Sequence, residues 1–198
     1  TRMAAVAGSV ADTVLNAMTD GADVRRAYVN NGGDIALHLQ EGESYSSAMV
    51  GHDGRELGQI IIQSGYNVGG IATSGWHGRS LSRGIADSVT VLSSCAAKAD
   101  VAATLIANAV DLASHPAITR RPANEVVDDS DLGKRPVVVG CGPLTQLDRN
   151  TALRAGHDCA LTMVKQNTIH AAALFLQNDA LATGSDMLTS YSRTKEHA

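Results

Sequence analysis

The stretch from Gly65 to Arg83 gathers the residues best suited to contact a ligand. Closely spaced glycines let main-chain N–H groups approach a bound molecule, and such concave backbone binds anions. His77 can transfer a proton near neutral pH, and Arg79 can pair with a phosphate or a carboxylate. The glycines follow neither the dinucleotide-binding pattern nor the P-loop pattern, so their spacing leaves a ligand loop and a simple sharp turn equally open. They are Gly65, Gly69, Gly70, Gly75 and Gly78.

A second candidate group is formed by Asp100 and Thr104, with Asn108 four residues further on. This spacing places the three on one face of a helix. A carboxylate and a hydroxyl one turn apart are hard oxygen donors, which suit Mg²⁺ or Ca²⁺. The alternative is the solvated face of a surface helix. Against it, this face carries no Lys, Arg or Glu apart from Lys98.

Two further groups of residues have plainer explanations. Asn30, Asn31 and Asp34 surround a Gly-Gly pair, and Asx side chains commonly stabilise such tight turns. The remaining histidines are scattered without metal-ligand spacing, so each is expected to be a surface or a core histidine. They are His38, His52, His115, His157, His170 and His197.

Thr1 would be a nucleophile if it were a mature N-terminus, because its free amine could then serve as the base. That arrangement is found in N-terminal nucleophile hydrolases. A truncated chain, a processed chain and a natural mature N-terminus all fit the sequence.

Helical periodicity supplies the elements that must position these residues. A four-residue repeat predicts an amphipathic first helix that ends at Asp20. A second, Ala-rich helix is expected to be capped by Ser93 or Ser94 and to run to about Asp111. The repeat in the first helix consists of Val6, Val10, Val14 and Met18, and Ala7, Ala11 and Leu15 beside it widen the apolar face.

Alternating and β-branched runs predict the strands. We expect them at residues 27–29, 35–39, 88–92, 137–141, 160–166 and 170–177, with a hairpin of 45–50 and 57–63. Residues 147–155 are predicted as a third helix, and 126–135 as an acidic surface loop. Long helices combined with hairpins indicate an α+β fold with an antiparallel or mixed sheet. One domain is expected over residues 1–182, followed by a polar tail over 183–198.

Composition limits the class of protein. With 44% hydrophobic residues the chain can bury a core, which excludes a disordered protein. The net charge of -4 and the lack of a basic stripe argue against nucleic acid as a partner. No apolar run approaches the roughly 20 residues that span a bilayer. Cys95, Cys141 and Cys159 lack metal-type spacing, and we expect three reduced, buried thiols in a cytoplasmic protein.

Four short runs occur in this order: Asn30–Ile35, Gly70–Gly75, Ser88–Leu92 and Ala99–Thr104. Through them the sequence resembles the ApbE-like superfamily, whose founding members are flavin transferases. Those enzymes use FAD and Mg²⁺ to attach FMN to a Thr or Ser of a target flavoprotein. Three further runs are similar to an uncharacterised branch of that superfamily: Met3–Gly8, Gly84–Thr90 and Asp129–Gly133. The resemblance extends from Thr1 to about Ala180.

The resemblance implies roles for individual residues. Asp100 and Thr104 match the positions that hold Mg²⁺ in the flavin transferases, and a carbonyl near Val6 would complete that site. The matching segments also imply which residues line a flavin pocket: Asn31, Gly32, Gly33, Asp34, Thr73, Ser74 and Gly75.

The sequence also departs from the flavin transferases. Ala7 stands where they have a Lys before the glycine of their first helix. Their His-x-x-Asp-Pro segment is missing, and a short link from Trp76 to Asp87 replaces it. Family members also carry an N-terminal portion ahead of the position of Thr1.

Three hypotheses therefore stay open. The first is a protein that binds FAD, FMN or another phosphate-bearing ligand with Mg²⁺, and that would be a transferase if it is an enzyme. The second is an autoprocessed amidohydrolase with Thr1 as nucleophile. The third is a ligand-binding domain without catalysis. The expected partners are a small-molecule ligand, an N-terminal fragment or a second chain, and further copies of the same chain.

Overall fold

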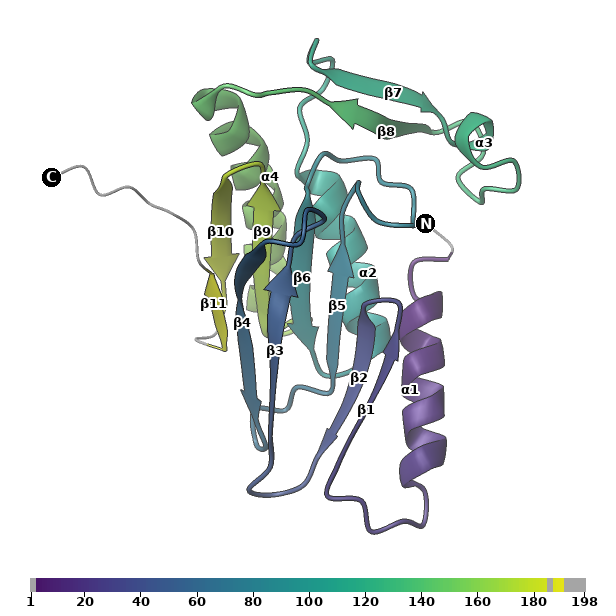
Figure 1. The fold of residues 1–198 in the computed structure, drawn as a ribbon, viewed down its shortest axis with the longest axis vertical. Helices are drawn as coiled ribbons and strands as arrows, with labels where there is room; N and C mark the ends of the chain where they lie inside the picture. The colour runs from purple at the N-terminus through teal and green to yellow at the C-terminus, as the bar shows by residue number, and fades with distance from the viewer. Residues whose placement is uncertain (1–2, 185–186, 191–198) are drawn as a thin grey trace, which may run out of the picture.

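The computed structural model describes residues 3–184 and 187–190, and it confirms the predicted α+β class (Figure 1). The helices are α1 (Val6–Thr19), α2 (Ala96–Ala109), α3 (Ala123–Val126) and α4 (Gln146–Lys165). The strands are β1 (Arg26–Asn31), β2 (Asp34–Leu39), β3 (Ser44–Val50), β4 (Glu56–Gln63), β5 (Gly70–Ser74), β6 (Ser88–Ser93), β7 (Ile118–Pro122), β8 (Pro136–Cys141), β9 (Ala171–Leu176), β10 (Asp179–Thr183) and β11 (Leu188–Ser190).

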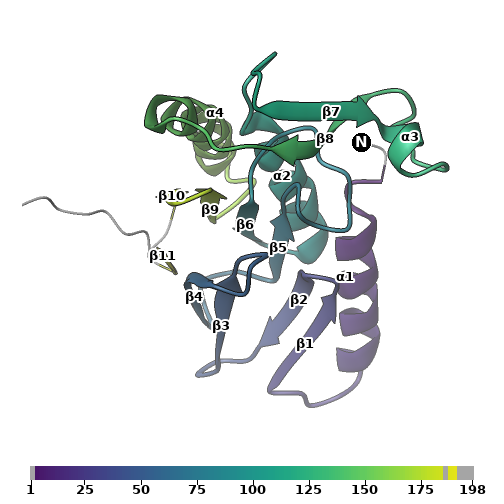
Figure 2. The ribbon, with the colours of Figure 1, turned by 45° about the horizontal axis from the view of Figure 1, so that its top comes forward.

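A six-stranded sheet forms the centre, in the order β1-β2-β5-β6-β9-β10, and every neighbouring pair is antiparallel. The hairpin β3–β4 and strand β11 form a separate three-stranded sheet. The strands β7 and β8 form a two-stranded ribbon that, with α3, lies across one end of the central sheet (Figures 1 and 2). The sheet is therefore antiparallel, one of the two kinds that the sequence allowed.

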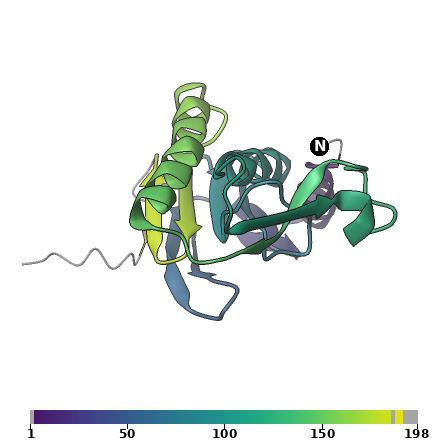
Figure 3. The same ribbon diagram turned by 90° about the horizontal axis from the view of Figure 1, so that it is seen from above.

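The molecule has three layers (Figure 3). The helix α1 packs on β1 and β2, α2 on β5 and β6, and α4 on β9 and β10, while the small sheet covers the opposite face. Strand β9 shows how the sequence serves both faces. Its residues 172, 174 and 176 join the core under the helices, and residues 171, 173 and 175 join the core under the small sheet, as the two-residue period of a strand requires.

The helix α1 is confirmed, and it buries only one side of its wide apolar face. Val10 and Val14 are 47% and 42% exposed, and the buried positions are Gly8, Ala11 and Leu15. A Cβ at Gly8 would lie 2.4 Å from the Ala96 carbonyl oxygen. The small residues are needed because α1 approaches the start of α2 closely.

The helix α2 is not capped by Ser93 or Ser94, so that prediction was wrong. Its N-cap residue is Cys95, which makes no side-chain cap. Asp12 of α1 takes that role: its two carboxylate oxygens accept hydrogen bonds from the Ala96 and Ala97 N–H groups at 3.0 and 2.9 Å. The first N–H groups of a helix need acceptors, and here a neighbouring helix supplies them.

The predicted strand at 160–166 was also wrong, because these residues continue α4 to Lys165. A short apolar run does not distinguish a buried helix from a strand. The buried residues of α4 recur every three or four positions, as on one helical face: Ala152, Leu153, Gly156 and Ala160. Thr145 begins this helix with a capping box, in which its side chain and that of Asp148 each accept from the other residue's backbone N–H.

Four strands were not predicted from the sequence: β5, β7, β10 and β11. Each is short, and β7 ends at a proline. The strand β11 lies within the segment expected as a polar tail, and it pairs with β4. The glycine-rich stretch contains β5 in its middle, and a Cβ at Gly70 would lie 2.1 Å from the Ala96 backbone nitrogen.

Among the described residues, no helix combines the length and the apolar character that crossing a membrane demands. Cys95, Cys141 and Cys159 are free thiols, and each is half-buried where the sequence suggested burial.

Candidate functional site

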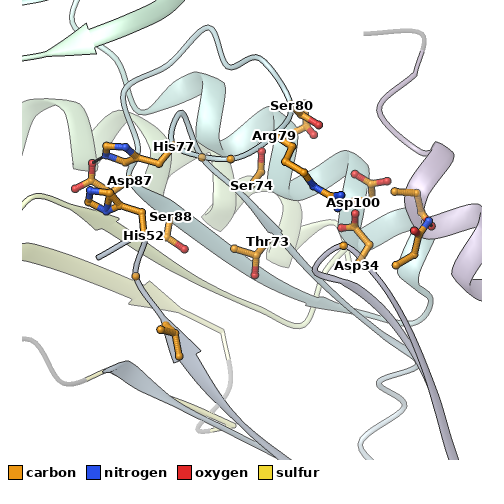
Figure 4. A pocket seen from close by; sticks show the side chains of 18 residues that line it. Asp34, His52, Thr73, Ser74, His77, Arg79, Ser80, Asp87, Ser88 and Asp100 are labelled. Carbon is orange, nitrogen blue, oxygen red and sulfur yellow. Dashed lines mark hydrogen bonds and ion pairs between the residues drawn. The ribbon is translucent and has the colours of Figure 1, made fainter. Parts of the chain in front are cut away.

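A polar cleft lies at the end of the central sheet where the β1–β2 turn, the end of β5 and the start of α1 meet the β5–β6 link (Figure 4). Its volume is about 490 Å³. It continues into a second hollow of about 720 Å³ that the loop after α3 borders. The two hollows form one cleft because they share much of their lining: Ala7, Asn31, Asp34, Ser74, Arg79, Ser80, Asp100 and Thr104.

Two carboxylates mark one end of the cleft. Asp34 opens β2 directly after the Gly32-Gly33 turn, and Asp100 projects from α2. Burial and the nearby charge of Asp100 raise the pKa of Asp34 to about 7, although Arg79 acts in the opposite direction. Burial also raises the pKa of Asp100. Two carboxylates that disfavour each other's ionised form would be stabilised by a shared cation.

The start of α1 completes this end of the cleft. The Gly8 N–H donates to Asp100 Oδ2 at 3.0 Å, which favours the ionised carboxylate. The Asn31 side-chain amide donates to the Ala7 carbonyl oxygen at 3.1 Å. The first turn of α1 is thus held against both the β1–β2 turn and α2.

Arg79 brings the positive charge of the cleft. It comes from the β5–β6 link, and its guanidinium lies so close to the β1–β2 turn that a Cβ at Gly32 would be 1.9 Å from Nη2. Gly32 has a φ of +72°, which only glycine adopts freely. Arg79 therefore lies against the β1–β2 turn, beside Asp34 and Asp100 (Figure 4).

Imidazole groups mark the opposite end of the cleft (Figure 4). Asp87 accepts from Trp76 Nε1 at 3.2 Å and lies 3.1 Å from His77 Nε2, and the Gln177 N–H donates to its other oxygen. The ring of His52, from the β3–β4 turn, stacks on His77 with a centroid distance of 3.5 Å and an interplanar angle of 14°. Burial lowers the pKa of His77, against the effect of Asp87, and His52 lowers it further.

Hydroxyl groups line the wall between the two ends. Ser74 and Ser88 line the cleft, and Thr73 Oγ1 lies 3.0 Å from Thr90 Oγ1 across the β5–β6 pair. Gly75 closes this wall, since a Cβ there would lie 2.3 Å from the Asp87 carbonyl oxygen. The wall is polar and leaves room for a flat or an extended ligand.

The cleft brings together most of the residues selected from the sequence. The selected residues that line it are Asn31, Gly32, Asp34, Thr73, Ser74, Gly75, His77, Arg79, Asp100 and Thr104. Gly33 is not part of the lining; its N–H donates to Asn30 Oδ1 at 2.9 Å within the turn. Asn108 borders the second hollow and accepts from the Arg83 N–H at 2.9 Å. Thr1 lies outside the described residues.

Sequence reasoning missed His52 and Asp87. His52 had no spacing signal, because a hairpin from a different sheet carries it to His77. Asp87 stands directly before β6, inside the run Gly84–Thr90 that resembled the family branch. That run was the available signal for Asp87.

The donor chemistry of the carboxylate end fits a hard divalent cation. Asp34, Asp100 and Thr104 offer two carboxylates and a hydroxyl to the same cleft, and oxygen ligands of this kind suit Mg²⁺. Within residues 3–184 and 187–190, no group of three or more His, Cys, Asp or Glu side chains forms a metal cluster. A cation here would therefore need further oxygen atoms from the backbone, from water or from the ligand itself.

Comparison with solved structures places the fold in the ApbE class. The crystal structure of the ApbE protein from Thermotoga maritima matches with a TM-score of 0.54, over 92% of this chain and 50% of that chain. The sequence identity is 14%, so the likeness concerns the fold.

The chain belongs to the family whose model is described as "AbpE bacteria", which matches residues 1–185. Among similar proteins, a UPF0280 protein of Methanococcus maripaludis strain C7 is 38% identical over 111 residues, 54% of this chain and 44% of that protein. A UPF0280 protein of Methanothrix thermoacetophila is 40% identical over 109 residues, 54% of this chain and 45% of that protein. The matches thus span less than half of each relative. They support the uncharacterised ApbE-like branch expected from the sequence.

Proposed function

We propose that the cleft binds a phosphate-bearing ligand together with a divalent cation, and that a flavin nucleotide such as FAD is the ligand. The observation that carries the proposal is the pair of half-buried carboxylates, Asp34 and Asp100, which face one cleft beside Thr104 and Arg79. One guanidinium, that of Arg79, faces the two carboxylates, and burial disfavours the ionised form of both. A bound Mg²⁺ would neutralise them and attract phosphate oxygens to this end of the cleft.

Arg79 supports a phosphate rather than a neutral ligand. In the flavin transferases a Lys precedes the glycine of the first helix, whereas Ala7 stands there in this chain. Arg79 places a cation in the same cleft from a different element, the β5–β6 link. The positive charge is therefore kept at the cleft, and a guanidinium can bind two phosphate oxygens at once.

We further propose His77 as the proton-transfer group. Asp87 lies 3.1 Å from His77 Nε2, so the carboxylate favours the tautomer with its proton on Nε2. Nδ1 is then free to accept a proton. Because burial lowers the pKa of His77, the ring is neutral at physiological pH. This chemistry suits FMN transfer from FAD to a hydroxyl acceptor. The acceptor oxygen would bond to the FMN phosphorus, the pyrophosphate bond of FAD would break, AMP would leave, and His77 would take the proton of the acceptor.

Titration of the protein with FAD and Mg²⁺ tests the ligand. We expect saturable binding at pH 8 that requires the metal, and an affinity at least about tenfold lower in Asp100→Asn, a loss of about 1.4 kcal/mol. Asp128→Asn is the control, because Asp128 is exposed and does not line the cleft. An absence of binding at high micromolar FAD, or equal affinity in Asp100→Asn, would contradict the proposal.

A second assay addresses the proton-transfer group. The protein is incubated with Mg²⁺, FAD and peptides that contain Ser or Thr, and FMN attachment is followed by mass. His77→Ala should reduce attachment while leaving FAD affinity within about threefold. His115→Ala is the control, since His115 pairs with Asp148 at the start of α4. Attachment at the wild-type rate in His77→Ala would exclude this role.

A further inference from the structure

The turn between β3 and β4 reaches the cleft from outside the central sheet. Val50, Gly51 and His52 line the imidazole end, yet they belong to the three-stranded sheet. Among the described residues, the backbone hydrogen bonds of residues 51–55 stay within the turn: Gly51 N–H to the Arg55 carbonyl at 2.8 Å and Gly54 N–H to the Gly51 carbonyl at 3.0 Å. The tip of this hairpin is thus not tied to the central sheet by its backbone.

The stacking of His52 on His77 connects the hairpin tip to the β5–β6 link. The ring of His52 stacks on that of His77 with a centroid distance of 3.5 Å, and the ring of Trp76 lies tilted against His77 with a centroid distance of 3.8 Å. His77 in turn is held by Asp87, which anchors Trp76 and the Gln177 N–H as well. His77 is therefore held within the β5–β6 link through Asp87, whereas His52 is carried by the tip of a hairpin that belongs to a separate sheet.

Building on the proposed function, we propose that the His52–His77 stack is a latch: it holds the β3–β4 hairpin over the imidazole end of the cleft and releases it when both rings are protonated. Two cations at stacking distance repel each other, whereas neutral or singly protonated rings do not. Acidification then opens the cleft and weakens ligand binding.

The groups around His77 set the direction of this response. His52 and Asp53 face it from the hairpin tip, and Asp87 faces it from the β5–β6 link. Asp53 is itself paired with Arg55, at 2.5 Å between Oδ2 and Nε. Burial and His52 lower the pKa of His77 in the closed form. The closed form therefore binds fewer protons than the open form, so it loses stability as pH falls below about 6.5.

The chain provides its own reporter for the test. Trp76 is the single tryptophan, and it contacts His77. Its emission is recorded across pH 8 to 5 without ligand, together with the NMR titration of His77 and the ring-to-ring NOEs between His52 and His77. We expect the NOEs to disappear over the pH range in which His77 titrates. NOEs that persist after His77 is protonated would overturn the latch.

Two variants separate the ring from its charge. His52→Phe keeps a stacked ring without a charge, so the hairpin should stay closed at pH 5.5. His52→Ala removes the stack, so the midpoint of the His77 titration should rise toward 6.5. Wild-type behaviour of the His77 titration and the Trp76 emission in His52→Ala would overturn the proposal. These measurements need no ligand, and their outcome is independent of whether FAD binds.

Ligand affinity gives the last comparison. Asp34 also titrates near pH 7, so the fall in FAD affinity from pH 8 to pH 5.5 is compared between the wild type and His52→Phe, which share Asp34. We expect the wild type to lose at least about threefold more affinity than His52→Phe, a difference above 0.6 kcal/mol. An equal loss in both proteins would show that the hairpin does not respond to pH.

Discussion

Asp34 is a cleft carboxylate whose pKa lies well above its ordinary value of 3.8. Its pKa of about 7 results first from burial and then from the charge of Asp100. Perturbed carboxylates concentrate at functional sites, because a folded chain seldom keeps an unfavourable charge without a use. A cation bound beside Asp34 and Asp100 would favour the ionised form of both carboxylates.

We predict that Asp34→Asn stabilises the protein in the absence of ligand, and more at pH 8 than at pH 5. The raised pKa of Asp34 means that folding is favoured below 3.8, the unfolded value, and that this contribution is lost as pH rises to about 7. Asparagine carries no charge and escapes that loss. Thermal unfolding at both pH values measures the effect. An equal loss of thermal stability at both pH values in Asp34→Asn would show that ionised Asp34 does not destabilise the folded protein.

Gly32 and Gly21 allow a matched test of the contact with Arg79. Both have positive φ, of +72° and +66°, but a Cβ at Gly21 meets nothing within 4 Å. We predict that either glycine-to-alanine change costs about 1–2 kcal/mol of stability, whereas only Gly32→Ala weakens FAD binding, because its methyl group displaces the guanidinium. Calorimetric titration of the two variants decides this. Equal FAD affinities of the two variants would show that Arg79 does not contribute to FAD binding.

At the scale of elements, the cleft depends on the junction of α1 with α2. Gly8 permits the close approach, Asp12 accepts from the first N–H groups of α2, and the Gly8 N–H donates to Asp100. The same junction thus caps a helix and orients a candidate metal ligand. On α1, Ala11 and Leu15 are buried, whereas Val10 and Val14 of the same apolar face are exposed. The apolar residues therefore predicted the helix but not which side of the face packs.

Asp12→Ala should lower the free energy of unfolding by about 1–2 kcal/mol, because two N–H groups at the start of α2 lose their acceptors. Asp20→Ala is a suitable control, since Asp20 is exposed at the other end of α1. Urea denaturation followed by circular dichroism gives both values. Similar losses in the two variants would mean that Asp12 does not act as the cap.

At the scale of the whole molecule, the cleft joins segments that lie far apart in the chain, between Met3 and Leu132. The start of α1, the β1–β2 turn, the β5–β6 link and α2 all contribute, and the loop after α3 borders the second hollow. A ligand that bridges these segments opposes their separation on unfolding. Binding and global stability are therefore linked.

Saturation with FAD and Mg²⁺ should raise the melting temperature. At a ligand concentration of 100 times Kd the expected gain is about 2.7 kcal/mol, which for a chain of this size corresponds to a shift of about 5–10 °C. Chelation of the metal should reverse the shift, and Asp100→Asn should show little of it. A shift that survives chelation would place the binding elsewhere.

The amino-acid sequence by itself determined the local features. The Asn-Gly turn, the shared face of Asp100 and Thr104, and the alternation within β9 follow from dihedral preferences and periodicity. Together with the family resemblance they selected most of the cleft. The tertiary structure alone decided which faces meet: Asp34 beside Asp100, Asp12 on α2, and His52 on His77. Periodicity predicts that an element has a polar or an apolar face. Which other element packs against that face depends on contacts between residues that are far apart in the chain.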